Sequence, residues 1–276
     1  YAPETQLYTY AQQGNTSYYA RAMQGAYQGF WENNIQADWV HIDDIDAYDV
    51  LYLPFPVALN RETADRLRAW VEAGGTLVSE GCPGYFGDRG RVGTRQPNHG
   101  LDALFGARES DVEFTPDLLD DLRWNLNGAP AWGGLFIQAY EPTTGTPVGW
   151  YDDGRVAAVD HTYGRGRTRI MGTMPSVGHG GHPGAGCPAL FADVLALAGR
   201  EPHVRCSDAR VKARLHDGPG GAYLWVANPV RRPIPVRLEL SATWGPVASA
   251  RTLWGAEATL EGHTVALTAG ARDVTV

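Results

Sequence analysis

The sequence predicts an α/β fold: an open parallel sheet with inserted β-hairpins, followed by a small antiparallel β-sandwich. Helix and strand patterns alternate with short connections up to residue 79, which is typical of a parallel sheet. Beyond Asp111 the strand patterns are separated by glycine-containing turns, as in hairpins. After Glu201-Pro202 short strands recur at regular spacing, which indicates an all-β module. We therefore expect two domains, residues 1–200 and 203–276.

The first domain begins with alternating helices and strands. Apolar residues recur with a period of about 3.6 residues over 16–32 and 61–73, which predicts two helices. Gly74-Gly75 provides a stop for the second helix. Residues 1–6 have the composition of a loop that follows a strand, so we expect the chain to be the C-terminal part of a longer protein. The strands expected in this stretch cover residues 36–41, 49–54 and 76–79.

A long loop over residues 81–100 and a short helix over 100–106 are expected before the hairpin region. Turns at Asp152-Asp153-Gly154 and Gly164-Arg165-Gly166 are expected to connect consecutive antiparallel strands. A further helix is predicted over 188–198. The remaining expected strands cover residues 135–140, 148–151, 156–161, 168–173, 211–215, 222–227, 234–240, 248–254, 264–267 and 274–276.

Composition excludes several classes of function. Of the 276 residues, 43% are hydrophobic and 20% are charged, which are values of a globular protein. The net charge of −8 argues against a nucleic-acid partner, because such surfaces cluster Lys and Arg. No stretch approaches the roughly 18 apolar residues of a membrane span. An odd set of cysteines, namely Cys82, Cys187 and Cys206, favours a cytoplasmic location, while secretion stays open because the N-terminus is expected to be missing.

Several motifs occur in an order that resembles a known family. Tyr48-Asp-Val-Leu-Tyr-Leu-Pro54 precedes a helix that ends in Trp70-Val-Glu-Ala-Gly-Gly-Thr-Leu-Val78. The motifs that follow in the chain are Gly100-Leu-Asp-Ala-Leu-Phe-Gly106, Tyr151-Asp-Asp-Gly154, Ala157-Ala-Val159, Tyr163-Gly-Arg-Gly166 and Ile170-Met-Gly-Thr173. In this order the motifs resemble the trimerisation domain of family 42 glycoside hydrolases, the β-galactosidases. The part beyond residue 202 also looks like the last domain of that family.

The resemblance implies a fold like that of class I glutamine amidotransferases, an open sheet of the flavodoxin type. It also implies that the two catalytic glutamates of the family lie on a (β/α)8 barrel that precedes this region, so no catalytic residue is carried over to this chain. The expected function is a non-catalytic scaffold that builds an oligomer, a trimer in the family, and helps to wall the active-site cleft of the barrel. No cofactor is expected.

A second hypothesis is a stand-alone, Cys-dependent hydrolase of the amidotransferase type. Cys82 follows the strand expected over 76–79, where that fold places a nucleophilic cysteine on a strained turn. Against this hypothesis, the family pattern around Glu72-Ala-Gly74 places Gly81 at the turn, and Pro83 lacks the N–H that an oxyanion hole needs. His99 is the histidine that could approach Cys82. A degenerate site on an inherited fold is the favoured interpretation.

His179, His182 and Cys187 have a spacing that zinc can use, His-x-x-His followed by Cys. They fall in a glycine-rich stretch, which we expect to be a solvated or interface loop because such loops seldom hold ligands in place. No metal site is therefore expected. The alternative hypothesis is a metal site formed by these three residues. The phosphate-loop-like Gly164-Arg165-Gly166 lies between two strands and is interpreted as a hairpin turn.

Aromatic residues make up 11% of the chain, and sugars stack on exposed tryptophans. We expect Trp124, Trp132 and Trp150 to contact carbohydrate, a partner subunit or the cleft of a neighbouring barrel, because they lie near loops and strand ends. A third hypothesis is a carbohydrate-binding module formed by the C-terminal β domain. Adjacent carboxylates such as Asp152 and Asp153 are interpreted as solvated, since glycosidase carboxylates face each other across a cleft.

Overall fold

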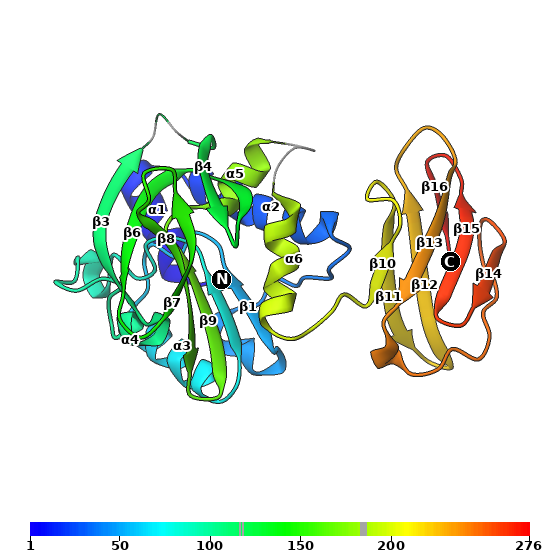
Figure 1. Ribbon diagram of the computed structural model, residues 1–276, viewed down its shortest axis with the longest axis horizontal. Helices are drawn as coiled ribbons and strands as arrows, with labels where there is room; N and C mark the ends of the chain where they lie inside the picture. The colour runs from blue at the N-terminus through cyan, green and yellow to red at the C-terminus, as the bar shows by residue number, and fades with distance from the viewer. Residues whose placement is uncertain (116, 118, 183–186) are drawn as a thin grey trace. The chain divides into compact units, whose positions relative to one another are not determined.

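The structure is a computed structural model that describes residues 1–115, 117, 119–182 and 187–276 (Figure 1). The chain divides into two compact units, each held together by its own internal contacts. The first unit combines Tyr1–Gly29 with Asp38–Ala198, and the second combines Phe30–Ala37 with Gly199–Val276. The second unit thus includes a short early segment that the sequence analysis assigned to the first domain. None of the described helices is both long enough and apolar enough to cross a membrane.

A mixed sheet forms the centre of the first unit. Among the described residues it has seven strands in the order β1-β2-β9-β8-β7-β4-β5. The pairs β1–β2 and β2–β9 are parallel and all other pairs are antiparallel. The strands are β1 (Val50–Leu53), β2 (Thr76–Ser79), β4 (Leu122–Leu126), β5 (Ala129–Gly133), β7 (Thr146–Tyr151), β8 (Val156–Tyr163) and β9 (Gly166–Met171), with a separate pair of β3 (Ala107–Thr115) and β6 (Leu135–Pro142).

The expected open α/β sheet with inserted hairpins is confirmed, and the predicted turns at 152–154 and 164–166 join β7 to β8 and β8 to β9. Parallel pairing is limited to three strands, because the hairpins extend the sheet in the antiparallel sense. The helices of the first unit are α1 (Pro3–Gln13), α2 (Ser17–Glu32, whose last residues belong to the second unit), α3 (Arg61–Glu72), α4 (Leu101–Phe105), α5 (Pro175–Gly181) and α6 (Pro188–Leu197), with 3-10 turns η1 (Ile42–Ala47) and η2 (Asp88–Gly90).

Helix α3 shows how local signals position the sheet. The Asn60 side chain caps its first turn by accepting a 2.7 Å hydrogen bond from the N–H of Thr63. Its apolar face, which includes Leu67 and Val71, is buried in the same core as β1 and β2. Gly75 follows the helix, and a Cβ at this position would lie 2.4 Å from the ring of Trp70. The helix itself ends at Glu72, where Gly74 with a φ of 124° turns the chain, and β2 begins at Thr76.

Two sequence expectations for the first unit are wrong. Residues 3–6 belong to α1 and not to a loop, and Ala2 is the N-cap: Pro3 starts the helix, and Gly14 ends it in the left-handed conformation. Residues 36–41 form no strand, since in the described structure they pair with no other strand. Ile35 and Ile42 at the two ends of this segment are buried instead, so its apolar pattern reflects core packing.

The second unit consists of two antiparallel sheets that share one apolar core, as in a small β-sandwich. In the described residues the four-stranded sheet has the order β10-β13-β15-β14 and the three-stranded sheet the order β11-β12-β16. The strands are β10 (Val204–Cys206), β11 (Lys212–Gly218), β12 (Gly221–Asn228), β13 (Ile234–Leu240), β14 (Ala258–Glu261), β15 (Thr264–Ala269) and β16 (Asp273–Thr275), with the 3-10 turn η4 (Ala242–Trp244).

The early segment of this unit is attached to β11. The Asn34 side chain accepts a 2.8 Å hydrogen bond from the N–H of Ala213, and the Arg214 guanidinium lies 4.3 Å from the centre of the Trp31 ring. The strand expected over 248–254 is absent from the described structure. Residues Leu253 and Trp254 instead hydrogen-bond to the main chain of Val276, and the nearby strand β14 begins only at Ala258.

Candidate functional site

The carboxyl ends of β1, β2 and β9 lie at one edge of the sheet, because these three strands are parallel neighbours. Open α/β sheets bind their ligands at this edge. Two residues that follow the strands have a strained left-handed backbone, Phe55 with φ 53° and Cys82 with φ 58°. This edge is therefore the candidate site.

Glu80 follows β2 directly and is fully buried. Its carboxylate accepts hydrogen bonds from the Tyr52 hydroxyl at 2.7 Å and from the N–H of Phe55 at 3.1 Å. Ser176 donates two more, from its N–H at 2.7 Å and its hydroxyl at 2.8 Å. Burial raises the pKa of Glu80 to about 7, and these hydrogen bonds oppose that rise.

A carboxyl group with such a pKa suits proton transfer, but this one has no access to a substrate. All four donors come from the protein, and the side chain is 0% exposed. Glu80 therefore works as a structural group, which holds the start of α5 against the ends of β1 and β2.

Cys82 is likewise closed off from solvent. Its side chain is 2% exposed and packs in an apolar cluster with residues such as Leu135 and Met174. Burial raises the pKa of its thiol well above the usual value, and the charge of Glu109 raises it further. In the described structure its main chain hydrogen-bonds to Gln138 and Tyr85, and no hydrogen bond joins it to His99. The thiol is thus neither ionised nor accessible.

The strained turn falls on Cys82 and not on Gly81, which corrects the placement expected from the family pattern. The N–H of Cys82, which an oxyanion hole would need, already donates a 2.7 Å hydrogen bond to Oε1 of Gln138. Gln138 is itself fully buried, accepts from the Tyr140 hydroxyl at 2.5 Å and donates to Glu109 at 2.6 Å. The turn at Cys82 therefore combines a strained backbone with an N–H that is already occupied.

The three residues considered as metal ligands are not brought together. His179 is buried within α5, where its ring contacts Phe191 edge-on. His182 follows α5 and stacks on Trp132 at 3.9 Å between ring centres, and Cys187 precedes α6 with its sulfur 3.9 Å from the carbonyl oxygen of Trp132. Among the described residues no group of three His, Cys, Asp or Glu side chains is placed to hold a metal ion. Part of the predicted glycine-rich loop is helix α5, and residues 183–186 lie outside the described part.

The three tryptophans have different environments. Trp124 on β4 is 2% exposed and donates a 3.2 Å hydrogen bond to the carbonyl oxygen of Trp132, so its expected place at the surface is corrected to the core. Trp132 on β5 is half-buried, and the Arg123 guanidinium lies 4.4 Å from its ring centre. Trp150 on β7 is also half-buried. Packing between the adjacent strands β4 and β5 therefore explains why Trp124 is buried.

Sequence reasoning missed the two polar residues that organise this edge, Glu80 and Gln138. A glutamate that directly follows the short strand expected over 76–79, at the end where ligands bind in open α/β sheets, was a usable signal for Glu80. The position of Gln138 within the strand expected over 135–140 gave no comparable signal, because its partners Cys82 and Glu109 lie far from it in sequence.

The fold defines an α/β domain built on an open mixed sheet whose parallel strands end in buried residues, followed by a small β-sandwich. Residues 4–184 match the family described as the beta-galactosidase trimerisation domain. The chain belongs to this family. Its first unit is thus a trimerisation domain, and neither a stand-alone Cys-dependent hydrolase nor a carbohydrate-binding module is favoured as the function of the chain.

Relatives agree with this assignment. The chain is 30% identical over 105 residues to beta-galactosidase GanA of Bacillus subtilis, a match that covers 37% of this chain. It is 25% identical over 168 residues to beta-galactosidase GalA of Bacillus licheniformis, covering 58% of this chain. The crystal structure of a beta-galactosidase from Bacillus circulans sp. alkalophilus has the same fold, with a TM-score of 0.71 at 18% identity over 93% of this chain.

These proteins are much longer than the chain. The matches span 16% of GanA, 24% of GalA and 37% of the B. circulans structure.

Proposed function

We propose that this chain is the accessory part of a β-galactosidase that hydrolyses terminal β-galactosides. In this proposal the glycosidic bond is cleaved by glutamates on a (β/α)8 barrel outside these 276 residues. The chain contributes by assembling three copies and by placing its first unit beside the cleft of a barrel. The observation that supports this most directly is the family match over residues 4–184, and the burial of Glu80 and Cys82 at the strand edge is consistent with it.

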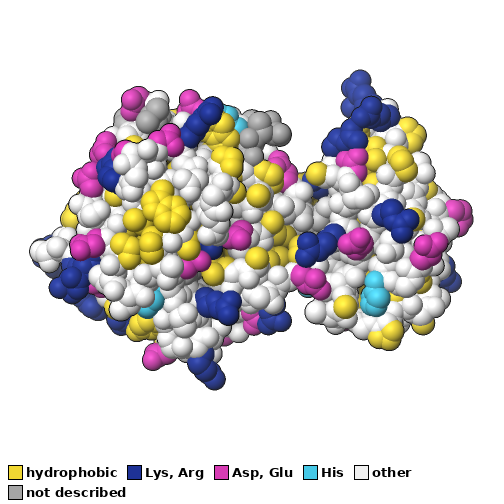
Figure 2. Space-filling view, viewed as in Figure 1, with side chains coloured by type: hydrophobic (Ala, Val, Ile, Leu, Met, Phe, Trp, Pro, Cys, Tyr) yellow, Lys and Arg dark blue, Asp and Glu magenta, His cyan; other side chains and the backbone are white. Residues whose placement is uncertain are grey.

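The first unit has apolar surface that suits subunit contacts. Figure 2 shows apolar side chains gathered on its visible face among charges of both signs. The most exposed of its large apolar residues are Leu7 at 69%, Tyr10 at 61% and Phe114 at 57%. Leu7 and Tyr10 are three residues apart on α1, so they share one face of that helix. We propose that these residues lie in the trimer interface, and that the half-buried Trp132 and Trp150 face a neighbouring subunit or barrel.

The mass of the chain in solution tests the assembly. Light scattering after gel filtration should give about three times the 30.0 kDa of one chain. Exchange of Tyr10 for Glu, or of Phe114 for Glu, should shift the mass toward that of a single chain, because an unpaired charge would be buried at the contact. The matched control is Leu253→Glu in the second unit, where an apolar side chain of 53% exposure lies outside the proposed interface. A monomeric wild-type chain, or a trimer that none of these changes affects, contradicts the proposed interface.

Activity tests the catalytic part. The chain alone should not hydrolyse a chromogenic β-galactoside, and the full-length protein should. Replacement of Cys82 by Ala in the full-length protein should leave the turnover rate unchanged. Hydrolysis by the 276-residue chain alone would overturn the proposal.

A further inference from the structure

A basic loop follows β2 in the first unit. Arg89, Arg91 and Arg95 lie in this loop, and all three side chains are exposed. Arg89 has a left-handed backbone with φ 61° inside the 3-10 turn η2, a strained conformation that is uncommon outside binding and catalytic sites. In the described structure Arg89 and Arg91 form no ion pair, whereas Arg95 lies 3.6 Å from Asp102. Two exposed guanidinium groups are therefore available to a partner.

Contacts with α3 and α1 fix the position of this loop. The N–H of Arg61, the first residue of α3, donates a 3.3 Å hydrogen bond to Oδ1 of Asp88. A Cβ at Gly90 would lie 3.5 Å from the ring of Tyr8 on α1. The basic loop therefore lies at the amino end of α3 and next to the helix whose exposed apolar face is proposed above as part of the trimer interface.

A cleft of about 510 Å³ lies at the carboxyl end of α3, between that helix and η1. Its lining includes two aromatic and two acidic side chains, Tyr48, Trp70, Asp46 and Asp49. Residues 42–49 carry four carboxylates in all, and the guanidinium of Arg66 lies 3.1 Å from that of Asp46. The carboxyl end of a helix adds partial negative charge. The cleft is therefore acidic and has aromatic sides.

The basic loop and the acidic cleft do not meet within one copy. They lie at the two ends of α3, whose 12 residues span about 18 Å. A ring of three identical copies is built from heterologous contacts, in which one face of each copy meets a different face of the next. Two faces of opposite charge on one unit meet this requirement, whereas a basic face repels the same face of another copy.

We propose that Arg89 and Arg91 of one copy dock in the cleft between η1 and α3 of a second copy, against Asp46 and Asp49. Arginine suits this cleft because its guanidinium binds carboxylates and also stacks on an aromatic ring such as that of Tyr48. Exposed ion pairs add little affinity, so the charges select the partner face while the apolar face of α1 supplies buried area. This inference rests on the proposed assembly of three copies and adds which two faces meet.

Light scattering after gel filtration of the 276-residue chain tests which faces meet. The pair Arg89→Asp and Arg91→Asp, and separately the pair Asp46→Arg and Asp49→Arg, should each bring like charges together and lower the mass from three copies to one. This corresponds to an association constant smaller by roughly a hundredfold or more. The chain with all four changes has both charges exchanged, so it should return to the mass of three copies. An unfolded variant could not be restored in this way, which separates loss of the contact from loss of the fold.

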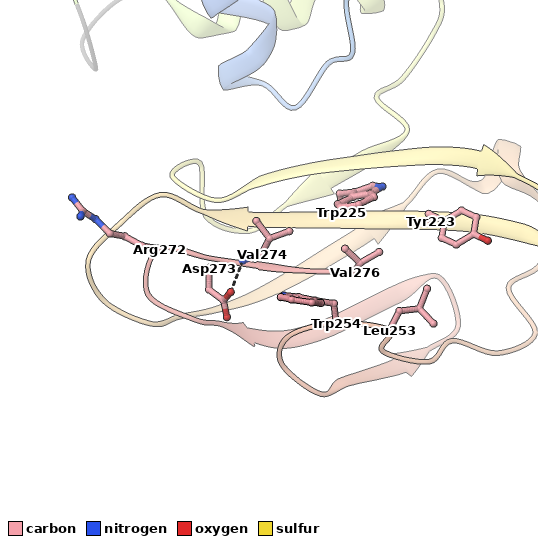
Figure 3. A pocket seen from close by; sticks show the side chains of 8 residues that line it. All are labelled: Tyr223, Trp225, Leu253, Trp254, Arg272, Asp273, Val274 and Val276. Carbon is pink, nitrogen blue, oxygen red and sulfur yellow. Dashed lines mark hydrogen bonds between the residues drawn. The ribbon is translucent and has the colours of Figure 1, made fainter.

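The controls lie in the second unit. Arg231→Asp with Arg232→Asp, and Glu257→Arg with Glu261→Arg, make the same changes of charge at exposed positions and should leave the mass unchanged. Trp254→Ala should also leave it unchanged, although this indole is 69% exposed and lines a groove of the second unit (Figure 3).

The inference is overturned if either pair of reversals leaves the mass at three copies, or if the fourfold variant stays a single chain. It is also overturned if a change in the second unit dissociates the assembly, because the contact then lies there. A monomeric wild-type chain removes the proposed assembly itself, and the inference with it. A wild-type trimer that the charge reversals do not affect leaves the proposed function intact and contradicts only the pairing of these two faces.

Discussion

The N–H of Cys82 donates a 2.7 Å hydrogen bond to Oε1 of Gln138, which lies 56 residues later in the chain. This bond occupies a donor that would have to be free in an amidotransferase-like nucleophile turn. The same glutamine oxygen also accepts from Tyr140. One buried amide thus closes the strand edge that would otherwise be the natural place for catalysis.

The first prediction concerns the reactivity of Cys82. Because burial raises the pKa of this thiol and excludes reagent, iodoacetamide at pH 7 should not label Cys82 in the folded chain. Labelling should become complete in urea, as read by mass spectrometry of tryptic peptides. The half-buried Cys206 serves as the internal comparison and should be labelled sooner. Rapid labelling of Cys82 under native conditions would revive the enzymatic hypothesis.

The second prediction concerns Gln138. Replacement by Leu leaves the N–H of Cys82 and the hydroxyl of Tyr140 buried without their acceptor. Unsatisfied buried groups of this kind cost about 1–3 kcal/mol each, so the free energy of unfolding should fall by roughly 3 kcal/mol. Urea unfolding measures this change. The exposed Gln12 is the control, and Gln12→Ala should change stability little. Equal stability of Gln138→Leu and the wild type would contradict the role assigned to this side chain.

The third prediction is a pH dependence due to Glu80. Its pKa is raised from 4.5 in the unfolded chain to about 7 in the folded one, mainly by burial. The folded state therefore binds the proton more tightly, and the stability linked to this proton is complete below about pH 4.5 and is lost as the pH rises through 7. By linkage the loss amounts to roughly 3 kcal/mol.

Urea unfolding at a series of pH values checks this dependence. Glu80→Gln should be less stable at every pH, because an amide cannot accept from all four donors. It should also lack the fall in stability between about pH 4.5 and 7. Glu72→Gln, at an exposed position, should keep that fall. If the wild type and Glu80→Gln have parallel stability curves, the titration of Glu80 does not contribute.

The fourth prediction concerns the contact between α2 and α5. A Cβ at Gly25 would lie 1.9 Å from the carbonyl oxygen of Ser176. In an exposed helix Gly→Ala stabilises by about 0.5–1 kcal/mol, but here it should destabilise by about 1–3 kcal/mol because the helices are forced apart. Thermal unfolding shows whether Gly25→Ala raises or lowers the stability of the folded chain. Gln24→Ala at the exposed neighbouring position should be close to neutral, and a Gly25→Ala variant more stable than the wild type would refute the close contact.

Elements could be predicted from the sequence where a hydrophobic period is combined with a capping residue or a glycine stop at the ends. The helix α3 has an apolar face, the cap Asn60 and the stop at Gly74, and both it and β2 were expected within one residue of their observed limits. The β4–β5 hairpin was missed although Asn127-Gly128 is a strong turn signal; both residues have positive φ, 52° and 79°. Its tryptophans had been interpreted as surface residues.

The candidate site could be predicted only in outline. The strand end and Cys82 were recognisable, but the partners that close the site come from distant parts of the chain. Ser176 lies 96 residues after Glu80, and no local pattern relates the two. Burial is equally invisible in sequence, which is why Trp124 could not be distinguished from the two half-buried tryptophans.

The hydrogen bond from Ala213 to Asn34 spans 179 residues, and it ties an early segment to the last module of the chain. During synthesis on the ribosome, residues 30–37 emerge long before β11 exists. Until β11 has been synthesised, these residues therefore lack the contacts that they make in the folded protein, such as that of Asn34 with Ala213. The same arrangement means that a gene fusion with a single junction near residue 199 would transfer an incomplete β-sandwich, so exchange of this module between relatives requires a matching change at residues 30–37.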